Sequence, residues 1–261
     1  MPSPTGGRVK RSVAALFLVL AVLLAGCTLF PEPSGGYFVL TFDGYNNVKH
    51  WMNHIDVFDE YDAKATFYIC RPDFLTEDEV LFLHEAQERG HEIAYHSTRH
   101  LNAMELVYFD GLSIDEYIEL EITPGLEYMR ALGFEPTAYA HPFGHHSREI
   151  TEVILTMFTT VRGVSPFGSW SMYDPVDNGY FRGVSIDVNP DGSEHIRFSA
   201  LERAMRAAAR SGSALTVYGH GIREEARRLT TPLDRLHRIL STAQSYGMTF
   251  ITASDLPGIF P

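Results

Sequence analysis

Residues 90–100 read Gly-His-Glu-Ile-Ala-Tyr-His-Ser-Thr-Arg-His. Within this stretch, Glu92–Tyr95 is typical of a short buried β-strand that ends at polar residues. His96 and His100 follow the strand four residues apart, so on a helical turn they would share one face and present imidazole nitrogens to one cation. Two such histidines can also be ordinary surface or core residues, but their position directly after a strand favours chemistry. The stretch predicts a strand that carries a functional site at its carboxyl end.

Short apolar runs of the same kind recur along the chain and alternate with longer amphipathic segments. The expected strands are Tyr37–Phe42, Ala65–Ile69, Glu92–Tyr95, Thr137–Ala140, Phe158–Val161, Tyr180–Ile186, Ala214–Tyr218 and Met248–Ile251. Strand–helix alternation of this length predicts a parallel sheet covered by helices. The residues with chemical potential at strand ends are Asp43, His96, His141, Asp187 and His220. A closed barrel would place all of them around one mouth, whereas an open sheet would gather only those near its switch point, so we expect an α/β barrel.

Three helix starts are visible in the sequence. Thr76–Glu79 and Ser113–Glu116 have the pattern of a capping box, in which the first and fourth residues satisfy each other's backbone N–H groups. Thr231-Pro232 is typical of an N-cap followed by a proline in the first turn. The helix after Ser113 contains Pro124, which should kink or split it because proline lacks an N–H for the helical hydrogen bond.

The N-terminal residues resemble an export signal. A basic segment precedes Ser12–Ala25, an apolar run about as long as the core of a signal peptide. The run leads into Leu24-Ala25-Gly26-Cys27, which resembles a bacterial lipobox. An ordinary secretory signal with an incidental cysteine is the alternative.

These features predict three parts: a lipoprotein signal peptide over 1–26, a tether over 27–36 that begins at lipidated Cys27, and one folded domain over 37–261. The protein would then be exported and lipid-anchored to a bacterial membrane, at the periplasmic face or the cell surface. After Cys27 the only cysteine is Cys70, so no intrachain disulfide is expected and Cys70 should be a small buried residue. The net charge of −12 argues against a nucleic-acid partner, which requires basic patches. We expect a monomer.

Several segments together resemble the polysaccharide deacetylase family (carbohydrate esterase family 4, the NodB homology domain). His96–His100 is similar to its second motif, His-Ser/Thr-x-x-His. The other matching segments are Leu40–Tyr45, Lys64–Tyr68, Ala138–Gly144 and Leu215–Ile222. They occur in the family's order over nearly the whole of 37–261.

The resemblance implies a distorted (β/α) barrel of about seven strands that removes acetyl groups from an N-acetylglucosamine-type polymer or peptidoglycan. It implies one divalent metal ion, Zn²⁺ or otherwise Co²⁺, Ni²⁺ or Mn²⁺, held by an Asp together with His96 and His100. It also makes His220 the general acid that protonates the leaving amine. Asp187 could position His220 or be a structural residue at a strand end. The segment His141, Pro142, Phe143 and Gly144 could bind substrate or be a polar loop.

Asp43 marks a departure from the family, which has two adjacent Asp residues where this chain has Asp43 followed by Gly44. If Asp43 matches the first Asp, it is the catalytic base and the metal lacks its carboxylate. If one residue has been deleted, Asp43 is the metal ligand and the base is missing. The next helix offers His54-Ile55-Asp56 as a source of a substitute, and a solvated helix face is the alternative. The Arg that often begins the third motif of relatives and orients the base is also missing, since Ala140-His141 stands there.

Two other functions are compatible with these motifs. One is a carbohydrate-binding lipoprotein of the same fold that has lost turnover, for which the missing Asp is the evidence. The other is a deacetylase that acts on O-acetyl groups or on non-sugar amides, because the same activated water would attack each carbonyl.

Overall fold

The computed structural model describes residues 35–44, 46–165 and 178–260. Seven parallel strands form its central sheet: β1 (Tyr37–Gly44), β2 (Thr66–Ile69), β3 (Glu92–Tyr95), β4 (Ala138–Ala140), β5 (Thr160–Val164), β6 (Tyr180–Ser185) and β7 (Ala214–Gly219). Each strand pairs with the next one in the chain, and β7 pairs with β1 from Tyr37–Ala214 to Phe42–Gly219, which closes the sheet. The predicted barrel of about seven strands is therefore confirmed.

Strand β10 (Thr249–Ile251) extends the sheet at the start of β1, where it pairs with Tyr37 to Val39. The same strand β1 pairs with β2 only later, from Thr41 to Gly44. Two further strands, β8 (Gly221–Arg223) and β9 (Thr230–Pro232), pair with each other outside the barrel. The expected helix start at Thr231-Pro232 was wrong by one residue, because both residues belong to β9 and Pro232 becomes the N-cap of the helix that follows.

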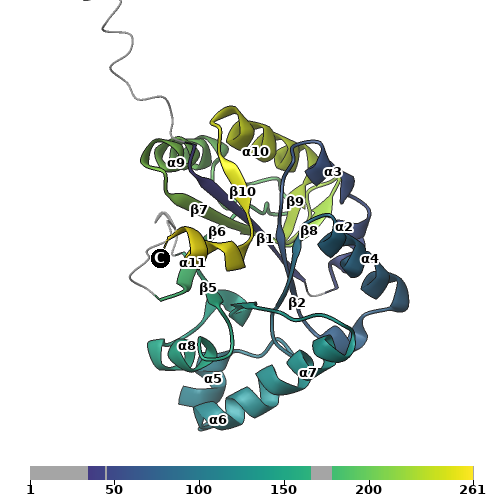
Figure 1. The fold of residues 1–261 in the computed structure, drawn as a ribbon, viewed down its shortest axis with the longest axis vertical. Helices are drawn as coiled ribbons and strands as arrows, with labels where there is room; N and C mark the ends of the chain where they lie inside the picture. Colours follow the sequence, from purple (N-terminus) through teal and green to yellow (C-terminus); the bar gives the residue numbers. More distant parts are fainter. Residues whose placement is uncertain (1–34, 45, 166–177, 261) are drawn as a thin grey trace, which may run out of the picture.

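Helices surround the strands, with α9 and α10 on one side of the barrel and α5 to α8 on the opposite side (Figure 1). The α-helices are α2 (Val48–Met52), α3 (Asp56–Asp59), α4 (Glu77–Glu88), α5 (Ala103–Tyr108), α6 (Ile114–Tyr117), α7 (Thr123–Ala131), α8 (Arg148–Ile154), α9 (Phe198–Ser211), α10 (Leu233–Ser245) and α11 (Leu256–Ile259). The 3₁₀ turns are η1 (Pro72–Phe74), η3 (Pro142–Gly144) and η5 (Ala253–Asp255). Among the described residues, no helix is long and apolar enough to cross a membrane.

Local sequence signals explain how several helices begin. Both capping boxes form, at Thr76 with Glu79 and at Ser113 with Glu116. Pro124 splits its helix as predicted: it lies in the first turn of α7, and a π-helical segment, η2 (Ile118–Ile122), precedes it. Proline cannot donate the usual helical hydrogen bond, and a π-turn absorbs the disturbance while shifting the side chains around it.

The core has two layers, one between the strands and the helices and one inside the barrel. Inside, the strands contribute small residues such as Ala94, Ala140 and Ala214. Their small volume leaves room for two large side chains within the barrel, Tyr68 and Arg162, which are 0 % and 1 % exposed. Cys70 is buried and free, as predicted.

Candidate active site

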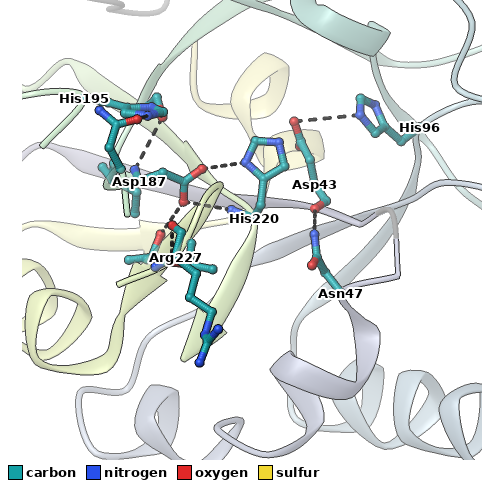
Figure 2. A network of polar contacts seen from close by, with 12 residues as sticks. Asp43, Asn47, His96, Asp187, His195, His220 and Arg227 are labelled. Atoms are coloured by element: carbon teal, nitrogen blue, oxygen red, sulfur yellow. Dashed lines mark hydrogen bonds and ion pairs between the residues drawn. The ribbon is translucent and has the colours of Figure 1, made fainter. Parts of the chain in front are cut away.

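The carboxyl ends of the strands surround a cavity of about 420 Å³. The cavity is lined by Asp43, Asn47, His96, Arg99, His100, His220, Arg228 and Leu229. Four residues singled out in the sequence, Asp43, His96, His100 and His220, thus lie in one place although they come from three different strand ends. Figure 2 shows His220 between Asp187 and Asp43, with His96 beyond Asp43.

Asp43 is bound by Arg162, a residue that the sequence motifs did not point to. One guanidinium nitrogen, Nη2, donates to both carboxylate oxygens, at 2.5 Å from Oδ1 and 2.6 Å from Oδ2. The rings of Tyr68 and Tyr218 lie 5.2 and 4.7 Å from the Arg162 guanidinium carbon and stabilise its charge. Gly183 keeps this space open, because a Cβ there would press against Tyr218 and Arg162. Arg162 therefore gives Asp43 the orienting cation that the third motif lacks.

The pKa of Asp43 reflects this pairing. Burial raises the pKa of the carboxyl group, but electrostatic interactions, chiefly with the Arg162 cation, outweigh burial and lower it below its ordinary value. Asp43 is consequently a fixed negative charge at neutral pH and a weak proton acceptor. Its Oδ2 atom lies 3.9 Å from His96 Nε2.

His96 and His100 are brought together by a tight turn. The helical turn expected for them is wrong: residues 96–100 are not helical, and Ser97 and His100 have φ angles of 77° and 64°. These left-handed conformations are strained for residues other than glycine. The turn nevertheless places the two rings with their centroids 4.9 Å apart, so the predicted proximity holds while its cause is different.

Glu121 holds this turn in place. Its Oε2 atom accepts hydrogen bonds from the backbone N–H groups of Arg99 at 3.2 Å and Leu101 at 3.1 Å, on either side of His100. The Glu121 residue is 0 % exposed, and it lies in the π-helical segment η2. Burial raises the pKa of Glu121, while hydrogen bonds from Leu101 and Arg99 oppose that effect. The sequence offered one indirect signal for Glu121, namely Pro124, which lies just after the π-helical segment.

His220 is hydrogen-bonded to Asp187. His220 Nδ1 lies 2.6 Å from Asp187 Oδ2, and the backbone N–H of His220 donates to Oδ1 at 3.1 Å. Thr231 Oγ1 donates to the same Oδ1 at 2.9 Å, and Asp187 is fully buried. Burial lowers the pKa of His220, but the hydrogen bond and the charge of Asp187 outweigh it and raise the pKa above 6.5. With Nδ1 engaged, Nε2 is the ring nitrogen left to exchange a proton.

The two histidines of the turn are suitable metal ligands. His96 Nδ1 donates to the Ala140 carbonyl at 2.8 Å, which fixes the tautomer and leaves the Nε2 lone pair for a ligand bond. Burial lowers the pKa of His96 to about 3 and also lowers that of His100, so both rings are in the neutral form that binds metals. Two imidazoles next to a carboxylate suit Zn²⁺ and similar ions.

The carboxylate, however, is not aligned as a third ligand. Within the described parts of the chain, no group of three His, Cys, Asp or Glu side chains is arranged to hold a metal ion. Both carboxylate oxygens of Asp43 accept hydrogen bonds from Arg162. This pairing explains why Asp43 does not form a three-residue group with His96 and His100. The residues present fit a site built on two histidines, with the nearest carboxylate engaged elsewhere.

The position after Asp43 offers no space for a second carboxylate. A Cβ on Gly44 would overlap the ring of Trp51, which is fully buried. Trp51 is fixed there by its indole N–H, which donates to the His220 carbonyl at 2.7 Å. The suggested replacement, Asp56, instead forms an ion pair with Arg89 at 2.7 Å and its side chain is 86 % exposed, so it does not reach the cavity.

The residues of His141–Gly144 are not among those that line this cavity. His141 is 1 % exposed, and its Nε2 lies 3.1 Å from Thr151 Oγ1. Its ring is therefore not available to a substrate, although substrate binding was one of the two roles that the sequence suggested for this segment. Pro142 is also buried. Phe143 is 56 % exposed, and its ring lies 4.6 Å from that of His100. Gly144 lines a neighbouring cavity, together with His145 and His146.

Comparisons with known proteins agree with this fold. A family model described as polysaccharide deacetylase matches residues 31–158. No curated protein sequence matches the chain.

Solved structures similar to this chain include the following three. A peptidoglycan deacetylase from Bacillus subtilis has a TM-score of 0.51 at 19 % identity, with 87 % of this chain and 93 % of that chain covered. A CE4 family pseudoenzyme from Bacillus anthracis has a TM-score of 0.56 at 16 % identity, with 86 % and 66 % covered. A family 4 acetyl xylan esterase from Clostridium thermocellum, in complex with a cobalt ion, has a TM-score of 0.55 at 17 % identity, with 84 % and 89 % covered. These likenesses establish the barrel fold alone, and the family model identifies residues 31–158 with the polysaccharide deacetylase family.

Proposed function

We propose that this protein is a metal-dependent hydrolase that removes acetyl groups from an amino-sugar polysaccharide, such as an N-acetylglucosamine polymer or peptidoglycan. The observation that carries the proposal is the arrangement of two hydrogen-bonded pairs at one cavity. His220 with Asp187 and Asp43 with Arg162 are both fixed by short hydrogen bonds. His96 and His100 lie beside them as neutral imidazoles.

His96 and His100 would hold one divalent ion, with Zn²⁺ as the first choice and Co²⁺, Ni²⁺ or Mn²⁺ as alternatives. When bound, such an ion would polarise the acetyl carbonyl and make a water molecule more acidic. The cobalt ion in the similar acetyl xylan esterase is consistent with a site for a divalent cation in this fold.

Proton transfer would fall to His220 and Asp43. Hydrolysis breaks the C–N bond of the acetamide, takes up one water, and gives acetate and an amine that needs a proton. His220 would supply that proton from Nε2, since Asp187 raises the pKa of the ring and so favours its protonated form. Asp43 would accept the proton of the attacking water, in a position fixed by Arg162. Its lowered pKa makes it a modest base, so we expect slow turnover.

The test uses the purified full-length chain and N-acetylglucosamine oligomers. His220→Ala should lower acetate release by about 10²–10⁴-fold and leave the bound metal unchanged, because His220 is not a proposed ligand. His96→Ala and His100→Ala should lose both metal and activity. His237→Ala is the matched control, since His237 contacts Tyr61 on the outside of the barrel. Loss of metal in His220→Ala would contradict its assigned role.

A second candidate is a carbohydrate-binding protein with impaired catalysis. It is favoured by the pairing of both Asp43 oxygens with Arg162 and by the lack of space beside Gly44. A similar structure is that of a pseudoenzyme, and a mutant of that pseudoenzyme has restored enzymatic activity. This candidate predicts metal and glycan binding without acetate release. An activity on O-acetyl groups, as in the similar acetyl xylan esterase, would appear as acetate release from acetylated xylan.

We further propose that the protein is exported and anchored to a bacterial membrane by lipidation of Cys27, which lies outside the described residues. The lipobox-like segment that ends at Cys27 supports this placement. Cys27→Ala should move the protein from the membrane fraction to the soluble fraction. An unchanged membrane fraction would contradict lipidation at this residue.

A further inference from the structure

Two exposed arginines, Arg99 and Arg228, line the cavity next to the proposed catalytic residues. Arg99 follows β3 in the turn between His96 and His100, and Arg228 lies between β8 and β9. Counting only the described residues, neither arginine forms an ion pair, although the chain as a whole carries a net charge of −12. A positive cavity entrance in an acidic protein calls for a specific explanation.

The other charges near the cavity do not neutralise this pair. Among the described residues that line the cavity, Asp43 is the one carboxylate, and Arg162 already compensates its charge. Glu121 attracts Arg99 electrostatically, but it is fully buried and its Oε2 atom binds two backbone N–H groups. Glu225 pairs instead with Arg227, at 3.5 Å. The accessible charge at the entrance is therefore positive.

The backbone fixes the positions from which both arginines extend. Arg99 lies in the strained turn whose N–H groups bind Glu121. Next to Arg228, Leu229 has a φ of 55°, and its carbonyl accepts from the backbone N–H of Gly221 at 3.3 Å. Thr230 Oγ1 also accepts from the N–H of Arg227 at 2.8 Å. Only the side chains need to be ordered when a ligand binds, which reduces the entropic cost of binding.

We propose that Arg99 and Arg228 bind a carboxylate of the substrate, so that the natural substrate is an acetylated amino-sugar chain bearing carboxylate groups. Guanidinium groups bind carboxylates through two parallel hydrogen bonds, with a geometry that a neutral hydroxyl group does not match. The carboxylate lies on the sugar that is deacetylated or on its neighbour, because both arginines line the same cavity as His220. This inference rests on the proposed function and names its substrate class.

The test compares three oligosaccharides on the full-length chain. One is the neutral tetramer of N-acetylglucosamine, one carries lactyl ether carboxylates on alternate acetylated sugars, and one alternates N-acetylglucosamine with glucuronate. The wild type should have a lower KM for at least one of the two anionic oligosaccharides than for the neutral tetramer. The anionic oligosaccharide with the lower KM identifies whether the carboxylate comes from a lactyl ether or from glucuronate. Arg99→Gln and Arg228→Gln should each raise that KM about three- to tenfold, and by a larger factor than they raise the KM for the neutral tetramer. About 0.5 M NaCl should reduce the preference.

Arg210→Gln is the matched control, because Arg210 is exposed in the last turn of α9, away from the cavity lining. The inference is overturned if the wild type binds the neutral tetramer as well as both anionic chains, or if the arginine variants change all three KM values equally.

Titration calorimetry with the same oligosaccharides separates this inference from the proposed function, since binding does not require turnover. Preferential binding of an anionic chain that both arginine variants weaken, without acetate release from any glycan, would refute the enzymatic proposal and uphold this one. Acetate release without any preference for an anionic chain would support the enzymatic proposal and refute the inference that Arg99 and Arg228 bind a carboxylate.

Discussion

Arg162 of β5 binds Asp43 of β1 across the inside of the barrel, although 119 residues separate them in the chain. The strands are not neighbours in the sheet, so the contact spans the barrel. Arg162 and Asp43 are 1 % and 5 % exposed. A buried ion pair fixes both partners in orientation more than it adds to stability. Here it fixes the carboxylate of Asp43, which lines the proposed active site.

Arg162→Met should lower the free energy of unfolding by about 3–5 kcal/mol, because it leaves Asp43 buried without its cation. The double variant Asp43→Asn with Arg162→Met should show a smaller loss in the free energy of unfolding than Arg162→Met alone, since no uncompensated charge remains. Urea unfolding of the two variants and the wild type measures this difference. Equal losses would show that Arg162 contributes through packing alone.

Asp187→Asn should lower kcat by about 10²–10⁴-fold and shift the alkaline limb of the kcat–pH profile to lower pH. The hydrogen bond and the charge of Asp187 are the two largest effects that raise the pKa of His220, so the loss of Asp187 should lower that pKa. An unchanged alkaline limb would contradict the role of His220 as general acid.

The same pair predicts a pH-dependent stability. The pKa of His220 in the folded protein is raised above its unfolded value of 6.5. The contribution of the Asp187–His220 pair to the free energy of unfolding is therefore fully present below pH 6.5 and is lost as the pH rises through the folded pKa. Asp187→Asn should therefore destabilise the protein more at about pH 6 than at about pH 9. Urea unfolding at both pH values provides the measurement, and a larger loss at the higher pH would contradict the pairing.

Glu121→Leu should weaken metal binding by about 10–100-fold, because supporting residues around metal ligands typically contribute this much. Two backbone N–H groups beside His100 would lose their acceptor. Glu121→Gln keeps a carbonyl oxygen and should retain most of the affinity. Competition with a zinc chelator measures both variants, and similar affinities for the Leu and Gln variants would refute the positioning role.

Gly44→Ala should destabilise the protein by about 1–3 kcal/mol, the usual cost of overpacking, because the added Cβ overlaps the Trp51 ring. Gly258→Ala is a matched control, since nothing lies within 4 Å of a Cβ at that position. Thermal unfolding compares the two. A Gly44→Ala variant as stable as the control would mean that the site has room for a second carboxylate.

The sequence predicted most of the barrel because its signals are local. Strand Glu92–Tyr95 was placed at the observed bounds, and both capping boxes form where their residues stand. The strand expected at Phe158–Val161 begins two residues later, because the Phe158 N–H still bonds to Ile154 at the end of α8. Residues at strand ends could be assigned to one mouth because a barrel brings all carboxyl ends together.

Contacts between distant residues could not be predicted in the same way. Arg162 appears in the sequence as a single cation in an apolar strand, and nothing nearby indicates that it reaches Asp43 across the barrel. The proximity of His96 and His100 was foreseen, but the left-handed turn between them depends on Glu121, 21 residues beyond His100. These features result from tertiary packing, which overrides local preference at functional sites.

Acetate release from acetylated amino-sugar oligomers is the measurement that tests the central claim most directly. The full-length chain loaded with Zn²⁺ should release acetate and free amine in equal amounts, lose this activity when a chelator removes the metal, and regain it when the metal is restored. Metal bound at His96 and His100, without acetate release from either a neutral or a carboxylate-bearing acetylated glycan, would contradict the account.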